Sequence, residues 1–80
     1  MKAVPSAEAK QLAAENLRHA RARAGLTRFR LAIKAGCDPS SIQAAERGYA
    51  GLATSLRIAA TLGLTPEQLF RRKRSNASAA

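Results

Sequence analysis

The 80-residue sequence is poor in the side chains that most enzymes use for chemistry. It contains one histidine (His19), one cysteine (Cys37), no tryptophan and only five acidic residues. These residues supply neither a nucleophile paired with a base nor a cluster of metal ligands. We therefore expect no enzymatic activity, no metal, no cofactor and no small-molecule ligand, and we assign no role to His19.

The single cysteine also excludes an internal disulfide, which is typical of cytosolic proteins. Cys37 is expected to be a small buried apolar group in a turn rather than a reactive thiol. No apolar run approaches the roughly 20 residues of a membrane-spanning helix. The first ten residues also lack the apolar stretch of a secretory signal. The sequence therefore predicts a cytoplasmic protein.

Acidic residues are far fewer than basic ones: five against 14, which gives a net charge of +9. Such a balance favours a polyanionic partner, nucleic acid before an anionic membrane surface. The basic run of residues 71–74 has no amphipathic aromatic face beside it, so we expect no membrane role. The length allows one domain with a small core.

The stretch of residues 27–48 predicts two short helices joined by one tight turn. Thr27 can cap the first helix with its hydroxyl, and Gly36 ends it, because glycine tolerates the left-handed conformation needed there. Asp38 is the N-cap of the second helix, and Pro39 stands at its first position, where a missing N–H costs nothing. Because the stop and the restart are so close, the helices must meet at a steep angle, as in a helix-turn-helix.

Three further helices are predicted outside this stretch. A long first helix covers residues 6–24, and a fourth covers about 52–62. Thr65, followed three residues later by Gln68, forms a capping box that starts a fifth helix. No strand pattern occurs, so the predicted fold class is all-α with five helices.

The predicted organisation has three parts: a flexible N-terminal arm (residues 1–5), a helix-turn-helix domain (6–71) and a basic, disordered tail (72–80). Apolar residues that recur at helical spacing are expected to form the core. They are Ala13, Leu17, Ala20, Ala24, Leu31, Ala32, Ala35, Ile42, Ala45, Leu56, Ala59, Leu62, Leu69 and Phe70.

These features resemble a known family, the Cro/Xre-like helix-turn-helix regulators that include the lambda repressor. The matching residues are Leu17-Arg18, Arg21, Gly25-Leu26-Thr27, Leu31-Ala32, Ala35-Gly36, Ile42, Glu46-Arg47-Gly48, Leu56 to Leu64 and Leu69-Phe70. The resemblance implies a five-helix, lambda-repressor-like domain in a bacterial or phage-encoded repressor that works at the nucleoid. It also implies that residues 38–47 form a recognition helix in the major groove, and that a homodimer binds an inverted repeat of double-stranded DNA.

Base contacts are expected from the outward face of the recognition helix. Ser40 and Ala44 match positions of base contacts in the family, and Gln43 could make two hydrogen bonds to adenine. Pro39 offers no hydrogen bond, and Ser41 lies nearby. Phosphate contacts are expected from Arg28, Arg47, Tyr49, Arg71, Arg72, Lys73 and Arg74.

The resemblance further implies a buried ion pair between Arg21 and Glu46, which would join the first helix to the recognition helix. An independent argument supports it: Glu46 lies one turn beyond Ile42 on the same side of its helix, so a partly buried carboxylate there needs a cation. Arg18 and Arg23 are expected on a solvated face.

Two features leave alternatives open. Phe29 and Ile33, four residues apart, form an apolar pair at positions that are normally polar in relatives. Either the first helix or the N-terminal arm covers them, or they form a patch for a protein partner in a binding module or antitoxin-like component. The basic run of residues 71–74 is either a solvated helix end or a set of phosphate contacts.

Overall fold

The computed structural model describes residues 6–72, and all regular structure in this range is helical. The helices are α1 (Ser6–Ala24), α2 (Arg28–Ala35), α3 (Pro39–Glu46), α4 (Leu52–Thr61) and α5 (Pro66–Leu69). The predicted all-α fold with five helices is confirmed for the described residues. The proposed arm of residues 1–5 and residues 73–80 of the proposed tail lie outside them.

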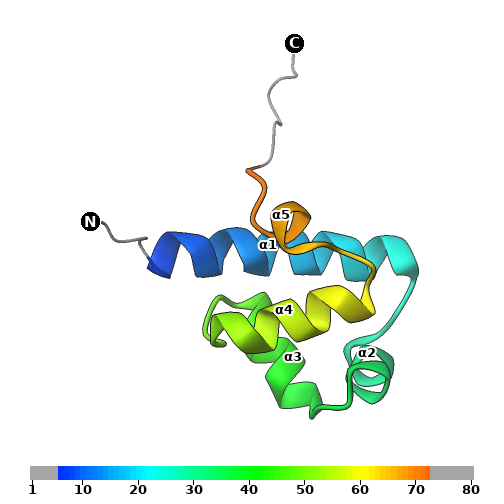
Figure 1. The fold of residues 1–80 in the computed structure, drawn as a ribbon. Coiled ribbons are helices and arrows are strands. Elements are labelled where there is room, and N and C mark those ends of the chain that lie inside the picture. The colour runs from blue at the N-terminus through cyan, green and yellow to red at the C-terminus, as the bar shows by residue number, and fades with distance from the viewer. Residues whose placement is uncertain (1–5, 73–80) are drawn as a thin grey trace.

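The helices α2 and α3 lie together on one side of α1, whereas α5 lies on its other side (Figure 1). The helix α4 contacts the other four helices, while α5 packs against α1 and α4. Both α1 and α4 therefore lie between α5 and α3.

The turn between α2 and α3 has the predicted chemistry, with one exception. The Thr27 hydroxyl accepts a hydrogen bond from the Arg30 N–H (3.1 Å), and Gly36 ends α2 with a φ of 72°. Asp38 occupies the N-cap position of α3, but its carboxylate makes no capping hydrogen bond. The Ser41 N–H, at the third helical position, donates instead to the Asp38 backbone carbonyl (2.9 Å).

Buried alanines dominate the core, so the helix backbones approach one another closely. The buried hydrophobic residues are Ala13, Ala14, Leu17, Ala20, Leu31, Ala32, Ile42, Ala45, Ile58, Ala59 and Leu69. Most of the predicted core is confirmed. Ala24 is exposed instead, because it stands at the end of α1, just before the chain turns at Gly25.

The helix α4 is rotated relative to the predicted orientation. Ser55 and Ile58 are buried on it, whereas Leu56 and Leu62 are only half-buried. A stripe that begins at Ser55 has the same helical spacing as the predicted one, and a serine does not register as a core residue in a hydrophobic pattern.

The short helix α5 is held at both ends. The capping box is confirmed: the Gln68 N–H donates to the Thr65 hydroxyl (3.1 Å), and the Thr65 N–H donates to the Gln68 Oε1 (2.9 Å). At the other end, the Asn16 Nδ2 of α1 donates to the carbonyls of Leu69 (2.5 Å) and Arg71 (3.0 Å). No local sequence pattern predicts this second clamp, because Asn16 lies more than 50 residues away in the chain.

Candidate nucleic-acid interface

The outward face of α3 carries the residues that were predicted to read bases. Pro39, Ser40 and Gln43 are exposed, and Ser41 and Ala44 are half-buried. Ile42 and Ala45 point into the core, with 0% and 1% of their surface exposed. Since residues three or four apart share a helix face, the burial of these two directs the predicted base-reading side chains outward.

The end of α3 and the following turn extend this surface. Ser40, Gln43, Ala44, Arg47 and Tyr49 line one shallow hollow of about 190 Å³. Arg47 is the C-cap of α3, and Tyr49 is 74% exposed. Three of the predicted base-reading residues and two of the predicted phosphate-binding residues therefore line the same hollow.

Asp38, predicted only as a cap, is the N-cap residue of the same helix, α3. Its side chain is exposed at the start of α3 and makes no capping hydrogen bond. The first residues of a recognition helix are the ones that reach base edges, and a carboxylate can accept a hydrogen bond from the N4 amino group of cytosine.

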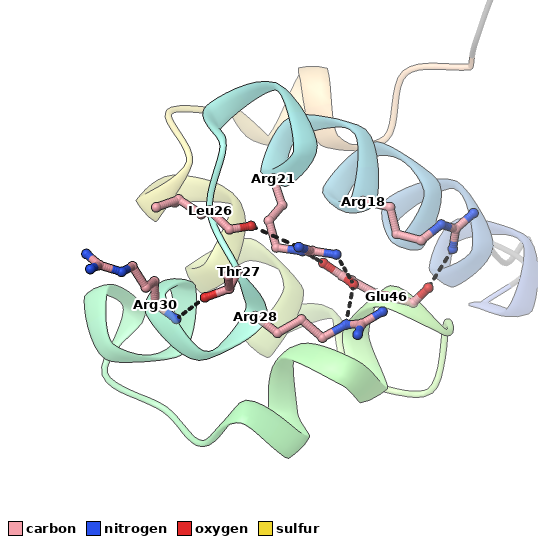
Figure 2. Close-up of polar contacts among 7 residues, drawn as sticks. All are labelled: Arg18, Arg21, Leu26, Thr27, Arg28, Arg30 and Glu46. Carbon is pink, nitrogen blue, oxygen red and sulfur yellow. Dashed lines mark hydrogen bonds and ion pairs between the residues drawn. The ribbon is translucent and has the colours of Figure 1, made fainter.

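The predicted pair of Arg21 and Glu46 is present in the structure (Figure 2). The Arg21 Nε lies 2.5 Å from the Glu46 Oε2, and its Nη2 lies 3.3 Å from the Oε1. The glutamate side chain is 2% exposed and the arginine side chain 19% exposed. Arg21 also donates from Nη1 to the Leu26 carbonyl (2.9 Å), so the same guanidinium fixes the connection between α1 and α2.

A second arginine shares the buried carboxylate. The Nε of Arg28, the first residue of α2, lies 2.9 Å from the Glu46 Oε1 (Figure 2). The Arg28 side chain is 51% exposed. The sequence prediction had assigned it to a DNA phosphate alone; the structure shows that it also binds within the protein.

The helix α1 holds the carbonyl end of α3 as well as its carboxylate. The Arg18 Nη1 donates to the Glu46 backbone carbonyl (2.6 Å), and the Gln11 Nε2 donates to the Arg47 carbonyl (3.4 Å). Terminal carbonyls of a helix lack partners within the helix, and cationic side chains are favourable there. Arg18 is exposed, as predicted, and in addition its guanidinium holds the end of α3.

Comparison with known proteins agrees with this architecture. A family model described as a helix-turn-helix domain matches residues 12–72. The chain belongs to the helix-turn-helix domain family. Among solved structures, it is similar to the crystal structure of a hypothetical transcription factor, NHTF, from Neisseria. The TM-score is 0.75 and the identity 23%, over 100% of this chain and 94% of that chain. No curated protein matches the chain.

The arginines at the end of the helix-turn-helix domain lie away from α3. Arg72 pairs with Glu8 of α1 (2.9 Å), and Arg71 lies 4.0 Å from Glu67. Both follow α5, on the side of α1 opposite α2 and α3 (Figure 1). Of the two alternatives for the basic run, this position favours a solvated helix end for Arg71 and Arg72. Lys73 and Arg74 lie outside the described residues.

The helix α1 does not cover the apolar pair on α2. Phe29 is 63% exposed and Ile33 is 64% exposed, and together with Arg30 and Lys34 they line a surface hollow of about 430 Å³. The first of the two coverings considered from the sequence is therefore wrong, and the second would need residues 1–5, which lie outside the described range.

The remaining candidate groups offer no site within residues 6–72. No group of three or more histidine, cysteine, aspartate or glutamate side chains in this range could hold a metal ion. Cys37 is half-buried and packs against the core. None of the described helices has the length and apolar character needed to cross a membrane.

Proposed function

We propose that the protein is a transcriptional regulator that binds double-stranded DNA sequence-specifically, with α3 in the major groove. The observation that carries this proposal is the outward face of α3, where small and polar side chains surround the shallow hollow that ends at Arg47 and Tyr49. The net charge of +9 supports a polyanionic partner. The name of the similar Neisseria protein, a hypothetical transcription factor, agrees with this function.

The surface residues divide into two roles under this proposal. Ser40, Gln43 and Ala44 contact base edges, with Pro39 and Ser41 beside them, and Asp38 accepts a hydrogen bond from a cytosine. Arg28, Arg47 and Tyr49 bind phosphates and fix the position of α3 on the duplex. The Arg28 Nε pairs with Glu46 at the end of α3, while about half of the side chain stays accessible to a phosphate.

We further propose that the protein is a repressor that binds an inverted repeat in bacterial or phage DNA as a homodimer. In such dimers, two recognition helices enter successive major grooves roughly 34–36 Å apart. Leu64 and Phe70, which are half-buried near α5, are the apolar residues available for contact between the two subunits on that side of the domain.

Selection of bound sequences from a random pool of double-stranded DNA tests the proposal. An enriched inverted repeat is the expected result, and an enriched single half-site would contradict the dimer but keep the sequence-specific role. The selection is repeated with Gln43→Ala, on the reading face, and with Arg57→Ala, on the exposed side of α4. Gln43→Ala should reduce the base preference at one position of the selected sequence, and Arg57→Ala should leave all preferences unchanged. A pool with no enriched sequence would overturn the proposed function.

A further inference from the structure

The outer face of α2 consists of two parallel rows of side chains. Phe29 and Ile33 form an apolar row, and Arg30 and Lys34 form a basic row directly beside it, each with the four-residue spacing of helix neighbours. All four side chains are exposed, and the four together line the hollow of about 430 Å³. The buried residues Leu31 and Ala32 occupy the opposite side of the helix.

Contacts elsewhere on α2 hold the helix in place without its outer face. The inner side packs on the core, Thr27 caps the start, and Arg28 pairs with Glu46. No part of the fold within residues 6–72 requires two large apolar side chains on the outside, where each leaves more than 60% of its surface in water. A paired apolar row beside charged residues is the composition of an interaction surface rather than of a solvated helix face.

The charges on this face limit which molecules can bind to it. Helix α2 contains no acidic residue, and a second copy of the chain, itself at +9, would place like charges against Arg30 and Lys34. Neither residues 1–5 nor residues 73–80 contain an acidic residue, so those segments of the chain cannot complement the basic row either. DNA would complement the basic row but not the apolar row, so the two rows together favour another protein, with carboxylates beside its apolar side chains.

We propose that the outer face of α2 binds an acidic amphipathic helix of a protein partner. Apolar side chains of the partner pack on Phe29 and Ile33, and its aspartate or glutamate side chains pair with Arg30 and Lys34. A helix fits because it presents an apolar row and an adjacent acidic row at the same four-residue spacing that α2 offers. The residues of this surface differ from those that line the hollow on α3.

The test begins with a displayed library of random peptides long enough for about four helical turns. The full chain is the target, and the expected result is enrichment of peptides with apolar residues four apart beside aspartate or glutamate. Enrichment of basic peptides, or of none, would overturn the proposal. The best enriched peptide is then synthesised and titrated in solution.

Two variants examine the rows separately. Phe29→Ser/Ile33→Ser should weaken the peptide roughly tenfold or more, because central apolar anchors carry most of the binding energy of such interfaces. Arg30→Glu/Lys34→Glu should weaken it comparably and should restore binding to a peptide whose acidic residues are replaced by lysine. The matched control, Lys10→Glu/Arg57→Glu, changes the net charge by the same amount on α1 and α4 and should leave the affinity within about twofold.

Other occupants give different results in the same set of proteins. If α2 binds a second copy, sedimentation will show a dimer that Phe29→Ser/Ile33→Ser converts to a monomer, with no peptide enriched. If the basic row binds DNA instead, Arg30→Glu/Lys34→Glu will strongly lower the affinity for DNA. In that case Phe29→Ser/Ile33→Ser will leave the affinity for the selected peptide unchanged. Either pattern overturns the proposal, as would failure of the charge swap. Circular dichroism melting confirms that each variant is folded, and since the peptide titrations contain no DNA, they stand independently of the proposed regulatory function.

Discussion

The Nε of Arg28 donates to the Oε1 of Glu46 across 2.9 Å, and the two side chains differ sharply in exposure, 51% against 2%. The glutamate is thus a buried acceptor, while Arg28 lies at the boundary with solvent. Arg21 binds the other side of the same carboxylate from within the protein. The helix-turn-helix is therefore fixed by one carboxylate at the end of α3, and the two arginines that hold it make unequal contributions.

Removal of the shared carboxylate should cost most of the domain's stability. Glu46→Ala leaves the largely buried Arg21 guanidinium without an anionic partner, so we expect a loss of about 3–5 kcal/mol in the free energy of unfolding. A small domain has little more than that in total. Thermal melting followed by circular dichroism measures the effect. Arg28→Ala is the control, since it removes a half-exposed partner and should cost no more than about 1 kcal/mol. Equal melting temperatures for wild type and Glu46→Ala would contradict the interpretation.

Arg28 should affect DNA binding through charge alone. With Arg28→Ala, the slope of log affinity against log salt should fall by roughly 0.9, the value for one phosphate contact, on specific and non-specific duplexes alike. Arg28→Lys should keep most of the slope because it keeps the charge. Titrations at several salt concentrations provide the measurement. A changed base preference with an unchanged slope would show that Arg28 reads sequence instead.

Asp38 should contribute to specificity without contributing to stability. Since its carboxylate makes no capping hydrogen bond, Asp38→Ala should change the free energy of unfolding by less than about 0.5 kcal/mol. The same variant should lose roughly 1–3 kcal/mol of preference for cytosine at one position. It should also bind non-specific DNA more tightly, because a negative charge near the phosphates is removed. Binding to a panel of single-base variants of the selected site checks both effects, and an unchanged preference would exclude Asp38 as a base-reading residue.

Arg71 and Arg72 should make no measurable contribution to DNA binding. They follow α5 on the far side of α1, and Arg72 already pairs with Glu8. The double variant Arg71→Ala/Arg72→Ala should leave the salt slope within about 0.2 of wild type, whereas two phosphate contacts would remove roughly 1.8. The same titrations as for Arg28 provide the comparison. A decrease in the salt slope of that size would show that Arg71 and Arg72 do contact DNA phosphates.

Gly48 and Gly36 allow a matched comparison of backbone strain and steric contact. Both have positive φ, 84° and 72°, but a Cβ at Gly48 would collide with the Gln11 side chain, whereas one at Gly36 would meet no atom within 4 Å. Each alanine variant should lose about 1–2 kcal/mol from the left-handed conformation. Gly48→Ala should lose more, and Gln11→Ala in the same chain should recover only that excess. Chemical denaturation of the four proteins gives the values; no difference between the two glycines would mean that Gln11 simply moves aside.

The sequence was sufficient wherever the determining interaction is local. The Thr27 cap, the Gly36 stop, Pro39 at the start of α3 and the Thr65 capping box all depend on residues within a few positions, and all are present. The inward positions of Ile42 and Ala45 follow from helical period, which also directs the proposed reading face outward.

The interactions that the sequence could not predict join distant segments. Arg28 reaches Glu46, Arg18 reaches the end of α3, and Asn16 reaches the carbonyls after α5. Each depends on how two helices approach, and residue type alone does not decide whether an arginine turns toward a carboxylate, a carbonyl or water. The orientation of α4 about its axis also depends on how helices approach one another. Two sets of residues on α4 have helical spacing, and the sequence does not decide which set faces the core.

The position of Arg72 has a practical consequence for work with this domain. The described chain ends on the side of α1 that faces away from α2 and α3 (Figure 1). A fluorescent protein, an affinity handle or an effector module fused downstream of this point would start on the side of α1 away from the proposed DNA surface. The same geometry makes the domain suitable as a DNA-directed anchor for cargo attached behind α5.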